Sequence, residues 1–154
     1  MISDNSSFVI SGIELKNRSW SNTTGLIQGV TTITSSNEAK KDFNGFQNTQ
    51  SIAEYTHASA AYECTVTQFK NGQMGYLASV GEWMEIINNL DEINKCMSLI
   101  DGLDIDEGAT SYWTSTQYNY EKAWLVTYNG NEFYPNDERK GVSFYAIRVI
   151  SQLI

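Results

Sequence analysis

Residues 112–134, YWTSTQYNYEKAWLVTYNGNEFY, contain the pattern from which the fold class follows. Residues 112–116 and 123–128 are rich in aromatic and β-branched side chains, a composition typical of β-strands. Asn129-Gly130 is the strongest signal for a tight hairpin in this chain, because both residues tolerate the positive φ angles that such turns need. The turn should join the second strand to a third over residues 132–134.

Outward from this segment, the chain alternates between strand and helix patterns. Three more segments have the β pattern: residues 8–15, 26–33 and 143–150. Apolar residues recur at helical spacing over residues 58–69 and in two segments that begin after Ser79 and at Asp91. Ser79 and Glu82 have the spacing of a capping box. These elements predict an α+β fold, with two to three helices packed on a twisted antiparallel sheet and connected by long loops.

Bulk properties exclude several classes of function. The chain has 154 residues, a net charge of −8 and a pI near 4.5. Such a charge argues against nucleic acid, which requires clustered Lys and Arg. It disfavours an anionic membrane surface for the same reason. No stretch approaches the roughly 20 apolar residues that span a bilayer, so no membrane insertion is expected.

Five motifs in the right order resemble the C-type-lectin-like fold, in the branch that contains formylglycine-generating-enzyme-like domains and the variable proteins of diversity-generating retroelements. They are Asp42–Thr49, Ala60–Cys64, Gly75–Trp83, Tyr112–Thr116 with Ala123-Trp124 and Asn129-Gly130, and Arg148-Val149. Ala78 stands where the family usually has proline. The resemblance implies a C-type-lectin-like domain over residues 42–154. Residues 1–41 are expected as an N-terminal β or irregular segment that acts as a docking arm.

The resemblance also implies a division between framework and display. Trp113, Trp124, Tyr145 and Arg148 would be framework. The residues between them would form one recognition face: Tyr118, Asn119, Tyr120, Glu121, Lys122, Glu132, Tyr134, Asn136, Asp137, Glu138, Arg139 and Lys140. Tyrosine supplies a large contact area with few rotatable bonds, and asparagine supplies both a donor and an acceptor. A polar surface in an Asn-rich chain is the plainer interpretation of the same residues.

Metal and catalytic sites are not expected. Tyr134-Pro135-Asn136-Asp137 lacks an acid before the proline, so it does not match the calcium loop of the sugar-binding lectins. The acidic cluster Asp101, Asp104, Asp106 and Glu107 lacks EF-hand spacing and is interpreted as a solvated turn.

Cofactors are not expected either. Cys64 and Cys96 lie on different predicted helices and should face the core, as two buried thiols or, alternatively, a disulfide. His57 has no second histidine with which to share a zinc ion. We therefore expect a protein that is not an enzyme.

Two functions fit these observations. The first is a ligand- or receptor-binding display module that recognises a cell-surface glycan or protein. The second is a structural or decoration domain of a virion, such as a head fibre or tail component, whose neighbouring subunits cover the same face; a homotrimer is expected in that case. Residues 1–7 show no signal-peptide pattern, which favours a virion surface over a bacterial cell surface or secretion.

Overall fold

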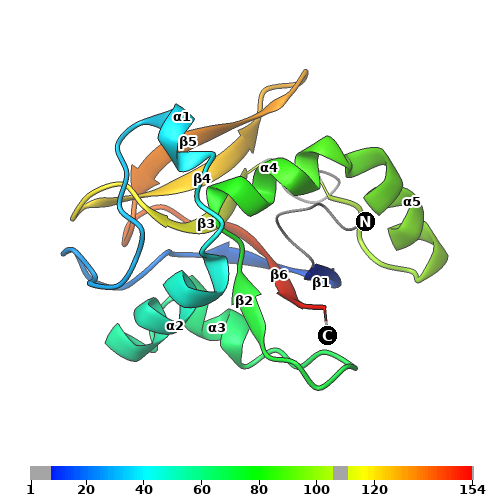
Figure 1. Ribbon diagram of the computed structural model, residues 1–154, viewed down its shortest axis with the longest axis horizontal. Helices are drawn as coiled ribbons and strands as arrows, with labels where there is room; N and C mark the ends of the chain where they lie inside the picture. Colours follow the sequence, from blue (N-terminus) through cyan, green and yellow to red (C-terminus); the bar gives the residue numbers. More distant parts are fainter. Residues whose placement is uncertain (1–7, 106–110, 154) are drawn as a thin grey trace.

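The protein is described here by a computed structural model that covers residues 8–105 and 111–153. The elements in chain order are β1 (Phe8–Arg18), α1 (Ser36–Ala39), α2 (Gly45–Tyr55), α3 (Ala60–Thr65), β2 (Gly75–Leu77), α4 (Val80–Asn88), α5 (Leu90–Leu99), β3 (Ser111–Gln117), β4 (Lys122–Tyr128), β5 (Phe133–Arg139) and β6 (Tyr145–Gln152). Helices α2 and α3 cover one side of the sheet, and α4 lies on the other (Figure 1). The predicted α+β class is confirmed.

Six strands form one sheet in the order β1-β6-β3-β4-β5, with β2 paired to β6 beside this path. The first and last strands are antiparallel neighbours, whereas β3 and β6 run parallel where Tyr112 pairs with Ala146. The predicted hairpin is confirmed: Tyr128 pairs with Phe133, and Gly130 in the connecting turn has a φ of 97°. The strand after the turn is longer than predicted and runs to Arg139.

The central strands are buried on both faces. In β4, Leu125 belongs to a cluster with Trp20 and Ile52 beneath α2 and α3. Its neighbour Val126 belongs to a second cluster with Trp83 beneath α4. Because successive side chains of a strand point to opposite faces, neighbouring residues of β4 pack into the cores on opposite sides of the sheet.

The strand predicted over residues 26–33 is wrong. Gly29 adopts a φ of 85°, and the segment is an irregular loop that still buries Ile27. Side chains supply part of its hydrogen bonding: Gln117 Oε1 accepts the Ile27 N–H at 3.1 Å, and Asn48 Oδ1 accepts the Thr31 N–H at 2.9 Å. Backbone pairing is limited to an isolated bridge between Thr32 and Gln117.

The helix predicted over residues 58–69 is shorter, and α2 before it was missed. Helix α3 ends at Thr65, and Val66 is exposed. Helix α2 buries Asn48 and Thr49 beside Ile52, so its inner face is partly polar and lacks a continuous apolar stripe.

Helix α5 presents Met97 to the core rather than Cys96, which is exposed. The expectation that both thiols face the core is therefore correct only for Cys64, which is buried. Both cysteines are free.

The segment expected as a docking arm contributes directly to the domain. Strand β1 pairs with β6 from Phe8 to Arg18. Trp20 is fully buried and donates its indole N–H to the carbonyl oxygen of Thr114 at 2.8 Å.

Candidate functional site

The turn between β3 and β4 holds the first group of predicted recognition residues, Tyr118–Lys122, in a fixed conformation. Asn119 Oδ1 accepts the N–H groups of Glu121 and Lys122 at 2.9 and 2.8 Å. The Tyr118 N–H donates to the carbonyl oxygen of Lys122 at 3.0 Å. These bonds use Asn119 as structural support for the turn, since an asparagine side chain commonly closes such a turn. Tyr120 is left exposed at its tip.

Two residues from distant segments lie around the same turn. The Gly25 N–H donates to the carbonyl oxygen of Tyr120 at 2.7 Å. Tyr55 Oη, from the end of α2, lies 3.8 Å from where a Cβ on Gly25 would be. Leu26 follows Gly25, and the exposed fractions of Leu26, Tyr55 and Tyr120 are 58, 53 and 55 %. We call these three residues the Tyr120 patch. No local sequence pattern links residues 26 and 55 to 120.

Other members of the first group are engaged within the protein. Tyr118 packs edge-to-face on Trp124, with ring centroids 5.2 Å apart. Lys122 Nζ lies 2.8 Å from Asp137 Oδ2. This hydrogen bond and the negative charge of Asp137 raise the pKa of Lys122. The Lys122–Asp137 pair bridges β4 and β5 and therefore supports the hairpin as well as the surface.

The predicted residues of β5 do not share one face. The register pairs Asp137 with Trp124 and Arg139 with Lys122, so their side chains lie on the α4 side of the sheet. Tyr134, Asn136 and Glu138 alternate with them and point to the opposite side. The expectation of a single recognition face is corrected by this alternation.

The predicted residues at the two ends of the β4–β5 hairpin are also far apart. Tyr134 pairs with Thr127, five positions along β4 from Lys122, or roughly 17 Å at the usual rise per residue. Glu132 is exposed beyond Tyr134 in the turn between β4 and β5. A small ligand cannot contact both ends of this hairpin, whereas a macromolecular partner can.

Lys140 is not displayed at all. It is fully buried, and its ammonium donates to Gly25 O at 2.8 Å and to Gln117 Oε1 at 2.5 Å. The Trp20 ring lies 4.8 Å from the same nitrogen. Burial lowers the pKa of Lys140 to about 8. The chain turns inward after β5, so a residue expected on the surface became part of the framework.

The expected framework residues are internal. Trp113 and Arg148 are fully buried, Trp124 is nearly so, and Tyr145 is half-buried against Trp113. Arg148 forms a buried ion pair with Glu14 of β1 at 2.9 Å. The pair joins the first and last strands of the sheet.

Two buried carboxylates connect the motifs that carry the lectin-like resemblance. Glu82 completes the predicted capping box with Ser79 and also accepts the Gly45 N–H at 2.9 Å. Burial raises the pKa of Glu82. Asp42 accepts a hydrogen bond from Thr116 Oγ1 at 2.7 Å. Both carboxylates are buried and accept several hydrogen bonds, so they hold neighbouring segments of the chain together.

Metal ligands do not cluster in the part of the chain that the structure describes. Residues 8–105 and 111–153 contain no group of three or more His, Cys, Asp or Glu side chains that could hold an ion. Asp106 and Glu107 of the acidic cluster lie outside these ranges. His57 stacks on Tyr62, with ring centroids 4.2 Å apart. Within the same ranges, no helix is both long enough and apolar enough to cross a membrane.

Comparison with known proteins gives one fold similarity. No family model and no curated protein matches the chain. The structure is similar to the crystal structure of a fimbrial protein from Bacteroides ovatus, with a TM-score of 0.64 and 19 % sequence identity. The similarity covers 95 % of this chain but 35 % of that protein, so the chain spans about a third of its length. At this identity the similarity concerns the fold.

Proposed function

We propose that this chain is a non-catalytic recognition domain of the C-type-lectin-like type, displayed on a bacterial surface structure, that binds a glycan or protein receptor. The ordered lectin-like motifs support the fold type, together with the pairing of the first and last strands. The similarity to a fimbrial protein supports a bacterial surface over the alternative location on a virion.

The Tyr120 patch is the observation that carries the proposal. Tyr120 sits on a turn fixed by the Asn119 side chain, and the Gly25 N–H holds the turn from the other side. Exposed aromatic side chains on a rigid support bind with little loss of conformational entropy. The patch joins two tyrosines and a leucine, a combination suited to stacking on a sugar ring or packing into a protein receptor.

The test is binding to a printed array of neutral and acidic glycans and to a panel of bacterial and animal cells. A Tyr55→Ala/Tyr120→Ala variant should bind at least tenfold more weakly than the unmodified protein, since central aromatic contacts dominate such interfaces. Leu99→Ala is the matched control, because Leu99 is exposed on α5. Helix α5 lies at the opposite end of the molecule from the turn between β3 and β4 (Figure 1). Tyr118 is left unchanged because it packs on Trp124.

Unchanged binding by the double variant, with an unchanged thermal midpoint, would show that the patch is not the recognition surface. Weakened binding by Leu99→Ala to the same extent would show a general loss of folded protein.

Subunit packing is a second candidate function, and a specific observation favours it. Val142 and Phe144, in the turn between β5 and β6, are both exposed large apolar residues. Exposed apolar patches commonly mark contacts between proteins. Light scattering should then give a homotrimer that becomes monomeric in Val142→Ser/Phe144→Ser. A monomer before substitution would contradict this candidate.

A further inference from the structure

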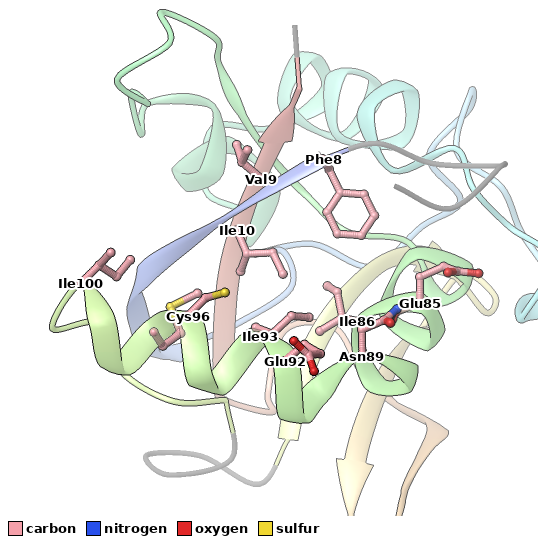
Figure 2. A pocket seen from close by; sticks show the side chains of 11 residues that line it. Phe8, Val9, Ile10, Glu85, Ile86, Asn89, Glu92, Ile93, Cys96 and Ile100 are labelled. Atoms are coloured by element: carbon pink, nitrogen blue, oxygen red, sulfur yellow. The ribbon is translucent and has the colours of Figure 1, made fainter. Parts of the chain in front are cut away.

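A groove of about 540 Å³ lies between β1 and the α4–α5 pair. Phe8 and Ile10 of β1 face Ile86 and Ile93 across it (Figure 2). Its lining is mostly apolar and is completed by these residues: Val9, Glu85, Asn89, Glu92, Cys96, Met97 and Ile100. The volume falls in the range of sites that bind ligands or partner side chains.

The groove exists because α5 has an apolar face that the sheet does not fully cover. Ile93, Met97 and Ile100 follow helical spacing, yet only Met97 is buried. Ile100 lines the groove and is 66 % exposed. Gly12 of β1 lies next to Ile100, where a Cβ on Gly12 would lie 3.6 Å from the Ile100 side chain. An apolar surface of this kind typically marks an interaction site.

The rim of the groove is acidic. Glu85, Asn89 and Glu92 supply its polar side chains, and no Lys or Arg is among the described residues that line it. Lys95 lies 3.9 Å from Glu92, but both side chains are mostly exposed, so water screens this pair.

The negative charge of the rim favours some molecules over others as ligands of the groove. A second copy of the chain would bring its own acidic rim and a net charge of −8. A fatty acid would place its carboxylate beside Glu85 and Glu92. Both are disfavoured by repulsion between like charges. A segment with apolar side chains for the floor and Lys or Arg for the rim is favoured.

We propose that this groove docks an amphipathic, basic segment of a partner protein. Amphipathic segments commonly bind in this way, with apolar anchors in the groove and charged residues along its edge. Helix α5, which lines the groove, lies at the opposite end of the molecule from the turn between β3 and β4 (Figure 1). The proposal is therefore independent of recognition by the Tyr120 patch.

Cys96 provides a built-in reporter, because it lines the groove whereas Cys64 is buried. The probe is a 14-residue peptide with leucines on one helical face and lysines on the other; the control peptide carries glutamate in place of lysine. The lysine peptide should bind the full chain and slow alkylation of Cys96 by iodoacetamide at least fivefold at saturation. The glutamate peptide should bind at least tenfold more weakly.

Two neighbouring residues give a matched pair of variants. Ile100→Lys places a cation in the groove and should weaken binding of the lysine peptide at least tenfold. Leu99→Lys makes the same change next to it, at a residue that is 85 % exposed and outside the lining, and should leave binding unchanged. Ile100 is largely exposed, so both variants should fold.

Glu85→Gln/Glu92→Gln should weaken the lysine peptide at least threefold and reduce the salt dependence of its binding. The proposal is overturned if both peptides bind equally, if Cys96 is not protected, or if Ile100→Lys and Leu99→Lys behave alike. A Tyr120→Ala variant should bind the lysine peptide normally.

Discussion

Lys140 should make the protein more stable as the pH rises from 7 to 9.5. Its ammonium is enclosed by Gly25, Gln117 and the Trp20 ring, and none of these carries a negative charge. Burial lowers the pKa of Lys140 from an ordinary value of 10.5 to about 8 in the folded protein. Between these two values the unfolded chain binds a proton that the folded protein has released. Unfolding then takes up a proton, and the free energy of unfolding increases with pH.

The magnitude follows from the two pKa values. Their difference of about 2.5 corresponds to ~3.4 kcal/mol of stability that charged Lys140 removes below pH 8. In the unfolded chain the pKa of Lys140 lies about one unit above pH 9.5, so ~1.4 kcal/mol of the lost stability is still not recovered at that pH. The gain between pH 7 and pH 9.5 is therefore about 2 kcal/mol.

The assay is urea unfolding at several pH values in this window, for the unmodified protein and for Lys140→Met. Methionine keeps an unbranched apolar stem of similar reach but does not titrate. Other groups that change charge near pH 9 are present in both proteins, so the difference between the two curves isolates Lys140. A difference that stays constant from pH 7 to pH 9.5 would show that Lys140 titrates normally and that its ammonium is solvated.

Three further predictions concern the framework and the thiols. Gly81→Ala, which usually stabilises a helix, should destabilise this protein by about 1–3 kcal/mol in urea, because the new Cβ would lie 2.4 Å from a backbone carbonyl oxygen. Arg148→Met should lower the free energy of unfolding by about 3–5 kcal/mol because Glu14 keeps a buried charge, and adding Glu14→Gln should recover part of the loss; equal losses in the single and double variants would contradict this. Mass spectrometry after alkylation of the native protein should find Cys96 modified and Cys64 intact, since burial raises the pKa of the Cys64 thiol and shields it; modification of both would show that the core opens.

Local signals were sufficient for the elements whose physical cause is local. The turn at Asn129-Gly130 follows from the tolerance of these residues for positive φ angles. The capping box forms because Ser79 stands three positions before Glu82, the spacing at which each side chain reaches the other's amide. β1 and the strands after residue 111 could be predicted from side chains that suit a pleated surface.

Elements with polar or irregular interiors could not be predicted in this way. Helix α2 was missed because the buried residues Asn48 and Thr49 are polar and interrupt the apolar pattern to which Ile52 belongs. The loop after Leu26 resembles a strand because Ile27 is buried, yet its amide bonds the Gln117 side chain, ninety residues away. Hydropathy periodicity reports burial, and it does not distinguish a paired strand from a buried loop.

The recognition surface shows the same division. The lectin-like resemblance implied that Tyr120 is displayed, and its exposure is a local consequence of the tight connection between β3 and β4. The folded chain alone brought Leu26 and Tyr55 beside it and buried Lys140. These outcomes depend on contacts between segments far apart in the chain and on the loss of water around the Lys140 ammonium. The neighbouring residues in the sequence determine neither of them.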